Sequence, residues 1–257
     1  MSAQPPRTTD KPDLDDALRA IDGVEGWLSE DQARRLWNAA VEVRSGGQIV
    51  EIGSFRGRST IVLSRAAAEG VGIVAIDPHG GGDRGPQEIA PEAARGHADH
   101  EAFHENLRRA GIEDGVTHVR RMSQDALDAV DGEVDLLYVD GAHRYSPARA
   151  DIERWGDRVR PGGSMLVHDS YNAVGVMLAQ LRVLFASPRW RYVGRSRSLA
   201  EYRREDLGPG ARAANLARQL PGLVWFARNC LIKVAMVARL PRVARALGLP
   251  DGDEWPY

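Results

Sequence analysis

Residues 135–170 read DLLYVDGAHRYSPARADIERWGDRVRPGGSMLVHDS and place polar side chains directly after two apolar runs. The first run ends at Asp140, with His143 three residues later, and the second ends at His168 and Asp169. In a parallel α/β sheet, side chains at the carboxyl ends of the strands face the ligand crevice. We therefore expect two carboxylates and two imidazoles in one pocket, a composition that suits a metal ion and a general base.

Apolar runs and helix-like segments alternate on both sides of this stretch. The predicted strands are residues 49–52, 73–76, 116–120, 136–139 and 165–167. The predicted helices start near Ser29, which forms a capping box with Gln32, and then cover 59–68, 100–110, 125–130, 147–159 and 173–186. Residues 190–202 are expected to add an antiparallel pair. This alternation predicts a mostly parallel sheet with helices on both faces.

Composition and charge limit the classes of protein to consider. The 257 residues are 43% hydrophobic and 27% charged, and the net charge of −2 does not fit a generally cationic nucleic-acid binder. The single cysteine, the absence of a signal-like N-terminus and the lack of 18 consecutive apolar residues predict a cytoplasmic protein without a membrane span. We expect a disordered segment at 1–13, a catalytic domain at 14–205 and a helical extension at 206–257.

The segment from Val50 to Thr60 joins a strand to a helix through glycines, which let the backbone approach a ligand. Asp77 closes the next strand, where an acid would bond both ribose hydroxyls of a nucleoside. Glu51 beside the loop suits a cationic cofactor better than a pyrophosphate, and the spacing differs from the dinucleotide fingerprint. A plain strand–helix turn remains the alternative for the glycines alone.

These motifs resemble the class I S-adenosylmethionine-dependent methyltransferases. More narrowly, residues 30–200 resemble the metal-dependent O-methyltransferases, both the catechol type and the relatives that methylate sugar hydroxyls. The resemblance implies a Rossmann-like fold and Mg²⁺ as a second cofactor. The cofactor-binding residues that it implies are Glu51, Gly53, Ser54, Gly57 and Ser59 for the methionine part, Asp77 for the ribose, Ser123 and Gln124 for the adenine, and Asp140 beside them.

The same resemblance implies a catalytic site. Asp140 and Asp169 match the two metal-binding acids of the catechol type, and Ser170 stands where that type carries an asparagine ligand. The third ligand is Ser170, His168 or water, because Mg²⁺ prefers oxygen and retains water readily. His143 occupies the position of the family's catalytic lysine, and we predict it to be the general base. The alternatives are that His143 only shapes its loop and that the two acids only cap turns or helices.

Several other polar residues are expected to have structural roles. Asp151 and Glu153 are interpreted as a solvated helix face. His79 is interpreted as loop polarity, with a contact to cofactor or substrate as the alternative. His100 and His104 would share one face of a helix near His97, but a metal site there lacks the acids and the strand context found at Asp140.

The last part of the chain, residues 207–250, combines basic and apolar residues without any acid. We expect it to pack on the domain or to form a homodimer, with an anionic membrane surface as the alternative. The predicted function is Mg²⁺-assisted methyl transfer to a hydroxyl of a saccharide or glycosylated metabolite, with a small-molecule or oligosaccharide acceptor and no nucleic acid. The rival functions are a metal-independent methyltransferase acting on a phenol or another small molecule, and a non-catalytic, membrane-associated cofactor-binding module.

Overall fold

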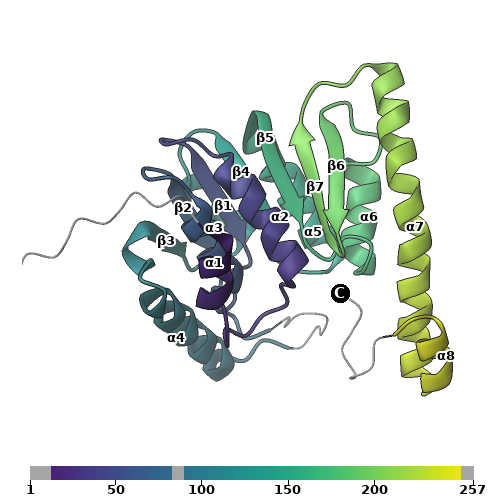
Figure 1. Cartoon of the computed structure of the whole chain (residues 1–257), viewed down its shortest axis with the longest axis horizontal. Helices are drawn as coiled ribbons and strands as arrows, with labels where there is room; N and C mark the ends of the chain where they lie inside the picture. The colour runs from purple at the N-terminus through teal and green to yellow at the C-terminus, as the bar shows by residue number, and fades with distance from the viewer. Residues whose placement is uncertain (1–12, 83–89, 250–257) are drawn as a thin grey trace, which may run out of the picture.

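Seven strands form one sheet in the order β3-β2-β1-β4-β5-β7-β6 (Figure 1). The computed structural model describes residues 13–82 and 90–249. The strands are β1 (Gln48–Ile52), β2 (Gly72–Ile76), β3 (Val116–Val119), β4 (Val134–Val139), β5 (Val159–Val167), β6 (Trp190–Ser196) and β7 (Leu199–Arg204). The first five are parallel, and β7 pairs antiparallel with both β5 and β6. The predicted sheet and its antiparallel pair are therefore confirmed.

Helices cover both faces of the sheet. Successive strand residues point to opposite sides, and both sides of the central strands are apolar. Ile49 and Ile73 face a core that includes α1, α2 and α3, whereas Val50 and Val74 face a second core with α5 and α6. The helices are α1 (Leu14–Ala20), α2 (Glu30–Val41), α3 (Arg58–Ala66), α4 (Ala93–Arg109), α5 (Tyr145–Arg154), α6 (Val174–Val183), α7 (Pro209–Val237) and α8 (Pro241–Ala246). Helices α1 and α2 form the expected N-terminal cap.

Some boundaries differ from the prediction for local reasons. The segment predicted as one helix at 125–130 forms two 3₁₀ helices, Ser123–Asp125 and Leu127–Ala129. Helix α4 begins at Ala93, earlier than expected. Strand β5 begins earlier than the predicted strand at 165–167, because it also includes the Pro-Gly-Gly sequence at 161–163, and the register to β4 shifts there. The disorder expected for 1–13 lies outside the described residues except at Asp13, which caps α1.

The C-terminal extension is helical, as predicted, and α7 stands beside β6 at one end of the sheet (Figure 1). Its contact face combines apolar side chains that pack against the second core, namely Leu216, Leu223, Trp225 and Phe226, with polar side chains that form hydrogen bonds. Asn215 accepts a hydrogen bond from the Tyr192 backbone at 2.7 Å, and Gln219 accepts one from the Tyr202 hydroxyl at 3.1 Å. Gly222 lies so close to the Tyr171 ring that an added Cβ would be 2.3 Å from it.

The length and composition of α7 bear on the expectation that the chain has no membrane span. Its 29 residues have a mean hydropathy of 1.4 over their most apolar window, and 22% of that window is buried, so by length and composition alone the helix could cross a membrane. Asn229 and Lys233 interrupt the apolar residues and donate hydrogen bonds to the backbone carbonyls of Tyr171 and Asn172 in the domain.

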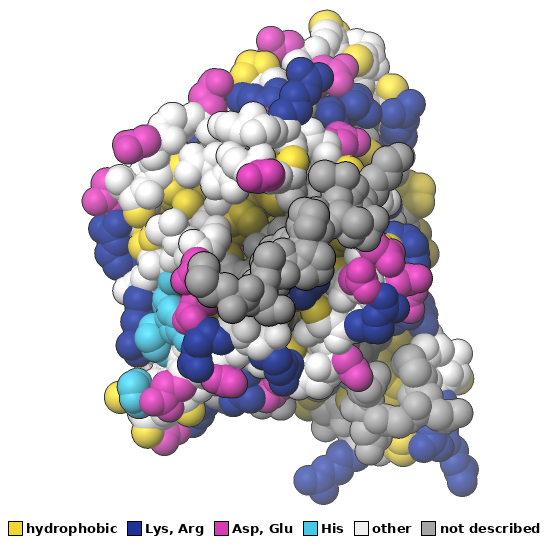
Figure 2. Space-filling model, turned by 60° about the vertical axis from the view of Figure 1, so that its left-hand side comes forward, with side chains coloured by type: hydrophobic (Ala, Val, Ile, Leu, Met, Phe, Trp, Pro, Cys, Tyr) yellow, Lys and Arg dark blue, Asp and Glu magenta, His cyan; other side chains and the backbone are white. Residues whose placement is uncertain are grey.

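Charged side chains of both signs are spread over the face shown in Figure 2. Histidines are instead gathered at one edge of that face. This edge belongs to β3 and α4, which lie at the opposite end of the sheet from α7.

Candidate active site

The polar residues of the site are placed by the sheet itself. Gly53, Asp77, Asp140 and His168 follow β1, β2, β4 and β5, and each donates its backbone N–H to the last residue of a neighbouring strand at 2.8–3.1 Å. The parallel hydrogen-bond ladder thus continues one residue past each strand. As a result, all four residues meet at the same edge of the sheet, as the sequence predicted.

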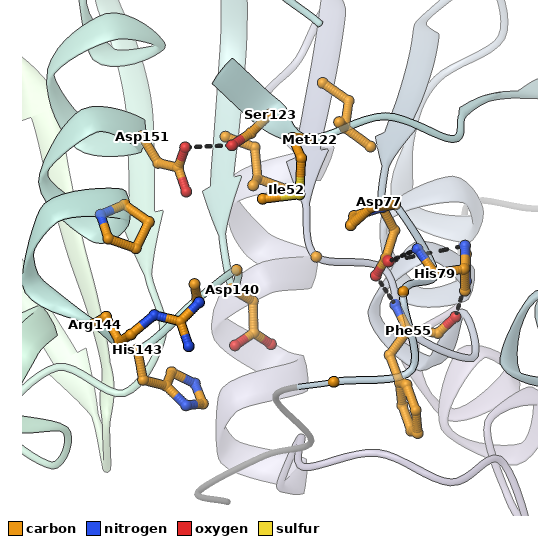
Figure 3. Close-up of a pocket in the computed structure, with 18 of the residues that line it drawn as sticks. Ile52, Phe55, Asp77, His79, Met122, Ser123, Asp140, His143, Arg144 and Asp151 are labelled. Atoms are coloured by element: carbon orange, nitrogen blue, oxygen red, sulfur yellow. Dashed lines mark hydrogen bonds and ion pairs between the residues drawn. The ribbon is translucent and has the colours of Figure 1, made fainter. Parts of the chain in front are cut away.

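A cavity of about 290 Å³ opens at this edge (Figure 3). The predicted residues that line it are Gly53, Asp77, Ser123, Gln124, Asp140, His143 and Asp169. It is also lined by residues that no motif singled out, including Trp27, Phe55, Met122 and Arg144. The cavity has the size and the mixed apolar and polar lining of a small-molecule site.

Asp77 is held in position by two backbone groups. Its Oδ2 accepts from the Phe55 N–H at 2.8 Å, and its Oδ1 accepts from the His79 N–H at 2.7 Å. His79 is buried and its Nε2 lies 2.7 Å from the Phe55 carbonyl oxygen, so its role is to join the loops after β1 and β2. Each carboxylate oxygen keeps a free lone pair, so Asp77 can still bind the two hydroxyls of a ribose.

The expected methionine-binding acid, Glu51, lies outside the cavity. It is fully buried and accepts hydrogen bonds from Ser59 and Thr60 in the first turn of α3. Burial raises its pKa to about 8, although these hydrogen bonds act in the opposite direction. Glu51 therefore links β1 to α3 beneath the glycine loop, because strand alternation turns its side chain away from the strand-end crevice.

Three further predicted cofactor residues also lie outside the cavity lining. Gly57 has φ of +86° and its N–H donates to the Ser54 carbonyl at 2.7 Å, so it closes the turn before α3. Ser54 and Ser59 are buried. These three residues therefore stabilise the loop and do not line the cavity.

Asp151 corrects the expectation of a solvated helix face. It is buried, and the Ser123 hydroxyl donates a hydrogen bond to it across the cavity wall (Figure 3). Burial raises the pKa of Asp151 to about 6, against the lowering effect of that hydrogen bond. The Trp155 indole, one turn further along, donates to the Ser123 carbonyl at 3.1 Å. The periodicity of the helix did not reveal which of its faces meets the cavity.

Two carboxylates and two imidazoles lie together after β4 and β5. His143 Nε2 is 2.7 Å from Asp169 Oδ2. His168 Nδ1 lies 3.2 Å from Asp140 Oδ1 and 3.5 Å from Asp169 Oδ2, at ion-pair distances. One ligand atom from each of Asp140, His143 and Asp169 lies within 4.8 Å of the other two. We refer to these four residues as the acid cluster.

The carboxylates control the protonation of this cluster. Burial alone would lower the pKa of His143 and His168, but the hydrogen bonds and charges of Asp169 and Asp140 raise both. Burial would conversely raise the pKa of Asp169, and the two imidazoles lower it well below its usual range. A metal cation bound to these carboxylates would compete with the protons that the carboxylates favour on the two imidazoles.

Ser170 does not reach this cluster. Asp169 has φ of +53°, which breaks the strand alternation, and the Ser170 hydroxyl donates to the Val167 carbonyl at 2.7 Å. Asn172 instead donates its Nδ2 to Asp169 Oδ1 at 3.0 Å, while the Tyr138 hydroxyl donates to Asp140 Oδ2 at 2.8 Å. The two acids are thus oriented by Asn172 and Tyr138, which no sequence motif indicated.

Tight backbone contacts also shape the cluster. An added Cβ at Gly53 would lie 2.1 Å from the Asp140 carbonyl oxygen, and one at Gly175 would lie 2.2 Å from the His143 carbonyl oxygen. The glycine motif pointed to Gly53 for its closeness to the cofactor. The only sequence indication for Gly175 is that a glycine stands in the first turn of α6, where nothing in the local sequence requires one.

The donor set fits a divalent cation. Asp140 and Asp169 supply oxygen atoms, the ligands that Mg²⁺ prefers, and neighbouring side chains already orient both carboxylates. His143 lies beside these two acids, whereas the expected ligand Ser170 does not reach them.

The strand order and the antiparallel β7 are those of the class I S-adenosylmethionine-dependent methyltransferase fold. Residues 50–170, which include most of β1, all of β2 to β5 and the acid cluster, match the family model described as a methyltransferase domain. The match confirms the resemblance to methyltransferases at the level of this domain.

Solved structures share this fold. Cofactor-bound Rv0187 from MTB is 22% identical, with a TM-score of 0.55, 80% of this chain covered and 100% of that chain. The O-methyltransferase from Bacillus cereus in complex with SAH is 17% identical, with a TM-score of 0.54 and coverages of 78% and 94%. The SAM-dependent O-methyltransferase from Thermotoga maritima is 15% identical, with a TM-score of 0.51 and coverages of 76% and 72%.

One curated relative shares a short segment. Uncharacterized protein y4gI of Sinorhizobium fredii is 42% identical over 53 residues, which make up 20% of this chain and 6% of that protein. The match therefore spans a small part of the length of that relative.

Proposed function

We propose that this methyltransferase transfers the methyl group of S-adenosylmethionine to a hydroxyl of a small molecule, with a divalent cation, preferably Mg²⁺, held by Asp140 and Asp169. The observation that carries the proposal is the acid cluster on the floor of the cavity, where two oriented carboxylates lie beside two imidazoles. The described fold is also shared with proteins named as O-methyltransferases.

Different residues of this chain bind the ribose, the adenine and the methionine part of the cofactor in this proposal. Asp77 is positioned to accept from the ribose hydroxyls, because two backbone N–H groups hold its carboxylate. Ser123, Gln124 and Met122 line the cavity where the adenine would lie. Gly53 lets the loop after β1 approach the Asp140 backbone closely, and the methionine part would lie against these two strand ends, which line the cavity.

The proposed general base is His143. It is buried beside Asp169 and lines the cavity, so its imidazole can take a proton from an acceptor hydroxyl in the same cavity. When bound, a divalent cation makes a coordinated hydroxyl more acidic and offsets the carboxylate charges that raise the pKa of His143. Asp169 then orients the ring, and methyl transfer depends mainly on the alignment of the acceptor oxygen with the sulfonium.

For the acceptor we propose a hydroxyl of a saccharide or glycosylated metabolite. A histidine in the position of the catechol-type lysine and the glycine-rich segment after Asp77 support this choice. Of that segment, His79 to Gly82 line the cavity, and residues 83–89 lie outside the described residues. We place the reaction in the cytoplasm, where the single Cys230 would remain reduced.

We also propose that the chain forms a homodimer through α7. One side of this helix exposes a row of large apolar side chains at helical spacing, namely Leu220, Val224, Leu231, Val234 and Val237. Paired charge-introducing substitutions on this row, such as V224E with V234E, should convert a dimer to a monomer in sedimentation. Flotation of the wild type with anionic liposomes, without dimer formation, would instead support contact with a membrane surface.

The deciding experiment measures S-adenosylhomocysteine formation by metal-stripped protein with a panel of sugars and phenols, before and after addition of Mg²⁺. We expect activity with a sugar hydroxyl that requires the added metal. Asp157→Asn, an exposed acid far from the cavity, serves as the matched control and should keep full activity. Turnover that persists in excess chelator would support the metal-independent alternative and contradict the proposal.

A further inference from the structure

A second group of histidines lies behind the cofactor cavity. His100 and His104 share one face of α4, and His118 lies on the edge strand β3. One ring nitrogen from each lies within 4.8 Å of the other two, and the ring centroids are 4.6–5.3 Å apart. We call these three residues the histidine cluster. Histidine side chains gather at this edge of the surface in Figure 2.

Two of these imidazoles have a ring nitrogen that is available to bind a metal ion. His104 Nδ1 lies 2.9 Å from Glu113 Oε1, so a hydrogen bond there leaves Nε2 as the free acceptor. A carboxylate behind a histidine is the usual second layer of a metal site, because it fixes the tautomer and the ring orientation. His118 Nε2 is buried and has no hydrogen-bond partner among the described residues.

Two imidazoles of the histidine cluster have lowered pKa values. Burial, followed by the neighbouring imidazoles, lowers the pKa of His118 to about 3, and burial, followed by the charge of Arg120, lowers the pKa of His100. Neutral imidazole is the form that coordinates a cation. Arg120 lies near enough to oppose a positive charge, and Glu113 partly offsets it.

Packing around Phe103 is the simpler explanation for these rings. Packing alone, however, leaves the buried Nε2 of His118 without a partner, which costs free energy in an apolar setting. It also gives no reason for Glu113 to orient His104. An ion shared by the three nitrogen atoms accounts for both features.

We propose that His100, His104 and His118 bind a divalent transition-metal ion, represented by Zn²⁺, at a site separate from the acid cluster. Three nitrogen ligands suit Zn²⁺ and do not suit Mg²⁺. Nitrogen atoms about 2.0–2.1 Å from a tetrahedral Zn²⁺ lie about 3.4 Å apart, so the rings must draw together slightly. Since all three are only partly buried, rotation of their side chains can supply this movement.

The expected consequence is structural. The ion would tie α4 to β3, and His79 lies between this site and the cavity, with its ring centroid 5.0 Å from that of His118 and 5.3 Å from that of His100. Because His79 joins the loops that hold Asp77, binding should stabilise the cofactor-side wall of the domain.

The test is calorimetric titration of the full, tag-free, metal-stripped chain with Zn²⁺, and spectroscopic titration with Co²⁺, whose visible absorption reports its ligands. We expect saturable binding of one ion to the histidine cluster and a rise in Tm. His118→Ala and His104→Ala should each weaken this binding at least tenfold. Asp169→Asn should leave it intact, which separates this site from the acid cluster even if the proposed activity proves wrong.

His97→Ala is the matched control, because His97 lies on the same helix but is exposed and 3.3 Å from Glu101. This variant should bind Zn²⁺ as the wild type does. Absence of saturable Zn²⁺ binding at a protein concentration of about 0.1 mM would overturn the proposal. Binding that survives His118→Ala unchanged would overturn it too, as would binding that disappears in Asp169→Asn.

Discussion

The acid cluster lines the cavity and the histidine cluster lies outside its lining, and each offers three groups to a metal. They differ in charge. In the acid cluster, Asp140 and Asp169 raise the pKa of His143 and His168 despite burial. In the histidine cluster, burial and like neighbours lower the pKa of His118 to about 3. The pKa of an imidazole is therefore raised by carboxylates in the acid cluster and lowered by burial and by other imidazoles in the histidine cluster.

This difference separates the roles of the two clusters. Carboxylate oxygens at the strand ends open into the cavity and can meet an acceptor, whereas the histidine cluster lies behind His79 and outside the cavity lining. Chemistry is expected at the first cluster and structural support at the second. Substitutions at either cluster should thus have different readouts.

The largest expected effect comes from Asp169→Asn. This change keeps the shape of the side chain but removes a proposed metal ligand and the carboxylate partner of His143. We expect kcat/KM to fall by about 10³-fold, comparable to the loss of a main electrostatic group in an active site. Assays at saturating Mg²⁺ measure this fall, with His118→Ala as the comparison variant, which should stay within about threefold of the wild type. Equal losses of kcat/KM in both variants would contradict the proposal that only the acid cluster takes part in the reaction.

Asp77→Ala should affect the cofactor and neither metal site. Loss of an ionised acceptor for two ribose hydroxyls should weaken S-adenosylhomocysteine binding by about 100-fold, or about 3 kcal/mol. Calorimetric titration measures this change. Zn²⁺ binding by the same variant provides the internal control, and unchanged cofactor affinity would contradict the position assigned to the ribose.

Asp151 supplies a third electrostatic environment, a buried carboxylate without an imidazole partner. Burial raises its pKa to about 6, so the folded state holds a proton that the unfolded chain loses near pH 4. Its contribution to stability should therefore decline as the pH rises from about 4 to 6 and stay constant above, by at most about 3 kcal/mol. Urea unfolding of wild type and Asp151→Asn over this range tests the sign. A wild-type profile that rises more steeply than that of the variant would contradict it.

The smallest effect is expected from Asn172→Ala. Its amide orients Asp169 without contacting the cavity, so Mg²⁺ affinity should fall about tenfold. Titration of activity with Mg²⁺ measures this shift, and kcat at saturating metal should change little. A large fall in kcat with unchanged metal affinity would instead give Asn172 a role in the reaction.

Much of the fold could be predicted because its signals are local. Short apolar runs indicated the strands, and the capping box at Ser29 indicated α2, which the structure confirms with both hydrogen bonds of the motif. The class of enzyme followed from the order and spacing of motifs such as Gly53 and Asp77. The boundaries were weaker, since the Pro-Gly-Gly run continues β5 and the segment after β3 forms two 3₁₀ helices.

The orientation of side chains was harder to predict than their position in the sequence. Glu51 lies in the expected motif but points to α3, and Ser170 follows Asp169 but turns away from it. Asp151 was assigned to a solvated face because helical periodicity alone does not show what lies opposite each face. Each error concerns a contact made by residues far apart in the chain.

The sequence by itself determined which segments form the sheet and that Asp77, Asp140 and Asp169 stand at strand ends, because apolar periodicity and the polar residues that end each strand are local properties. Only the tertiary structure decided which groups meet. It joined His118 to His100 and His104, Asn172 to Asp169, and Lys233 of α7 to the Asn172 carbonyl at 2.8 Å. Such contacts depend on how strands pair and helices dock, which long-range packing selects and local sequence does not encode.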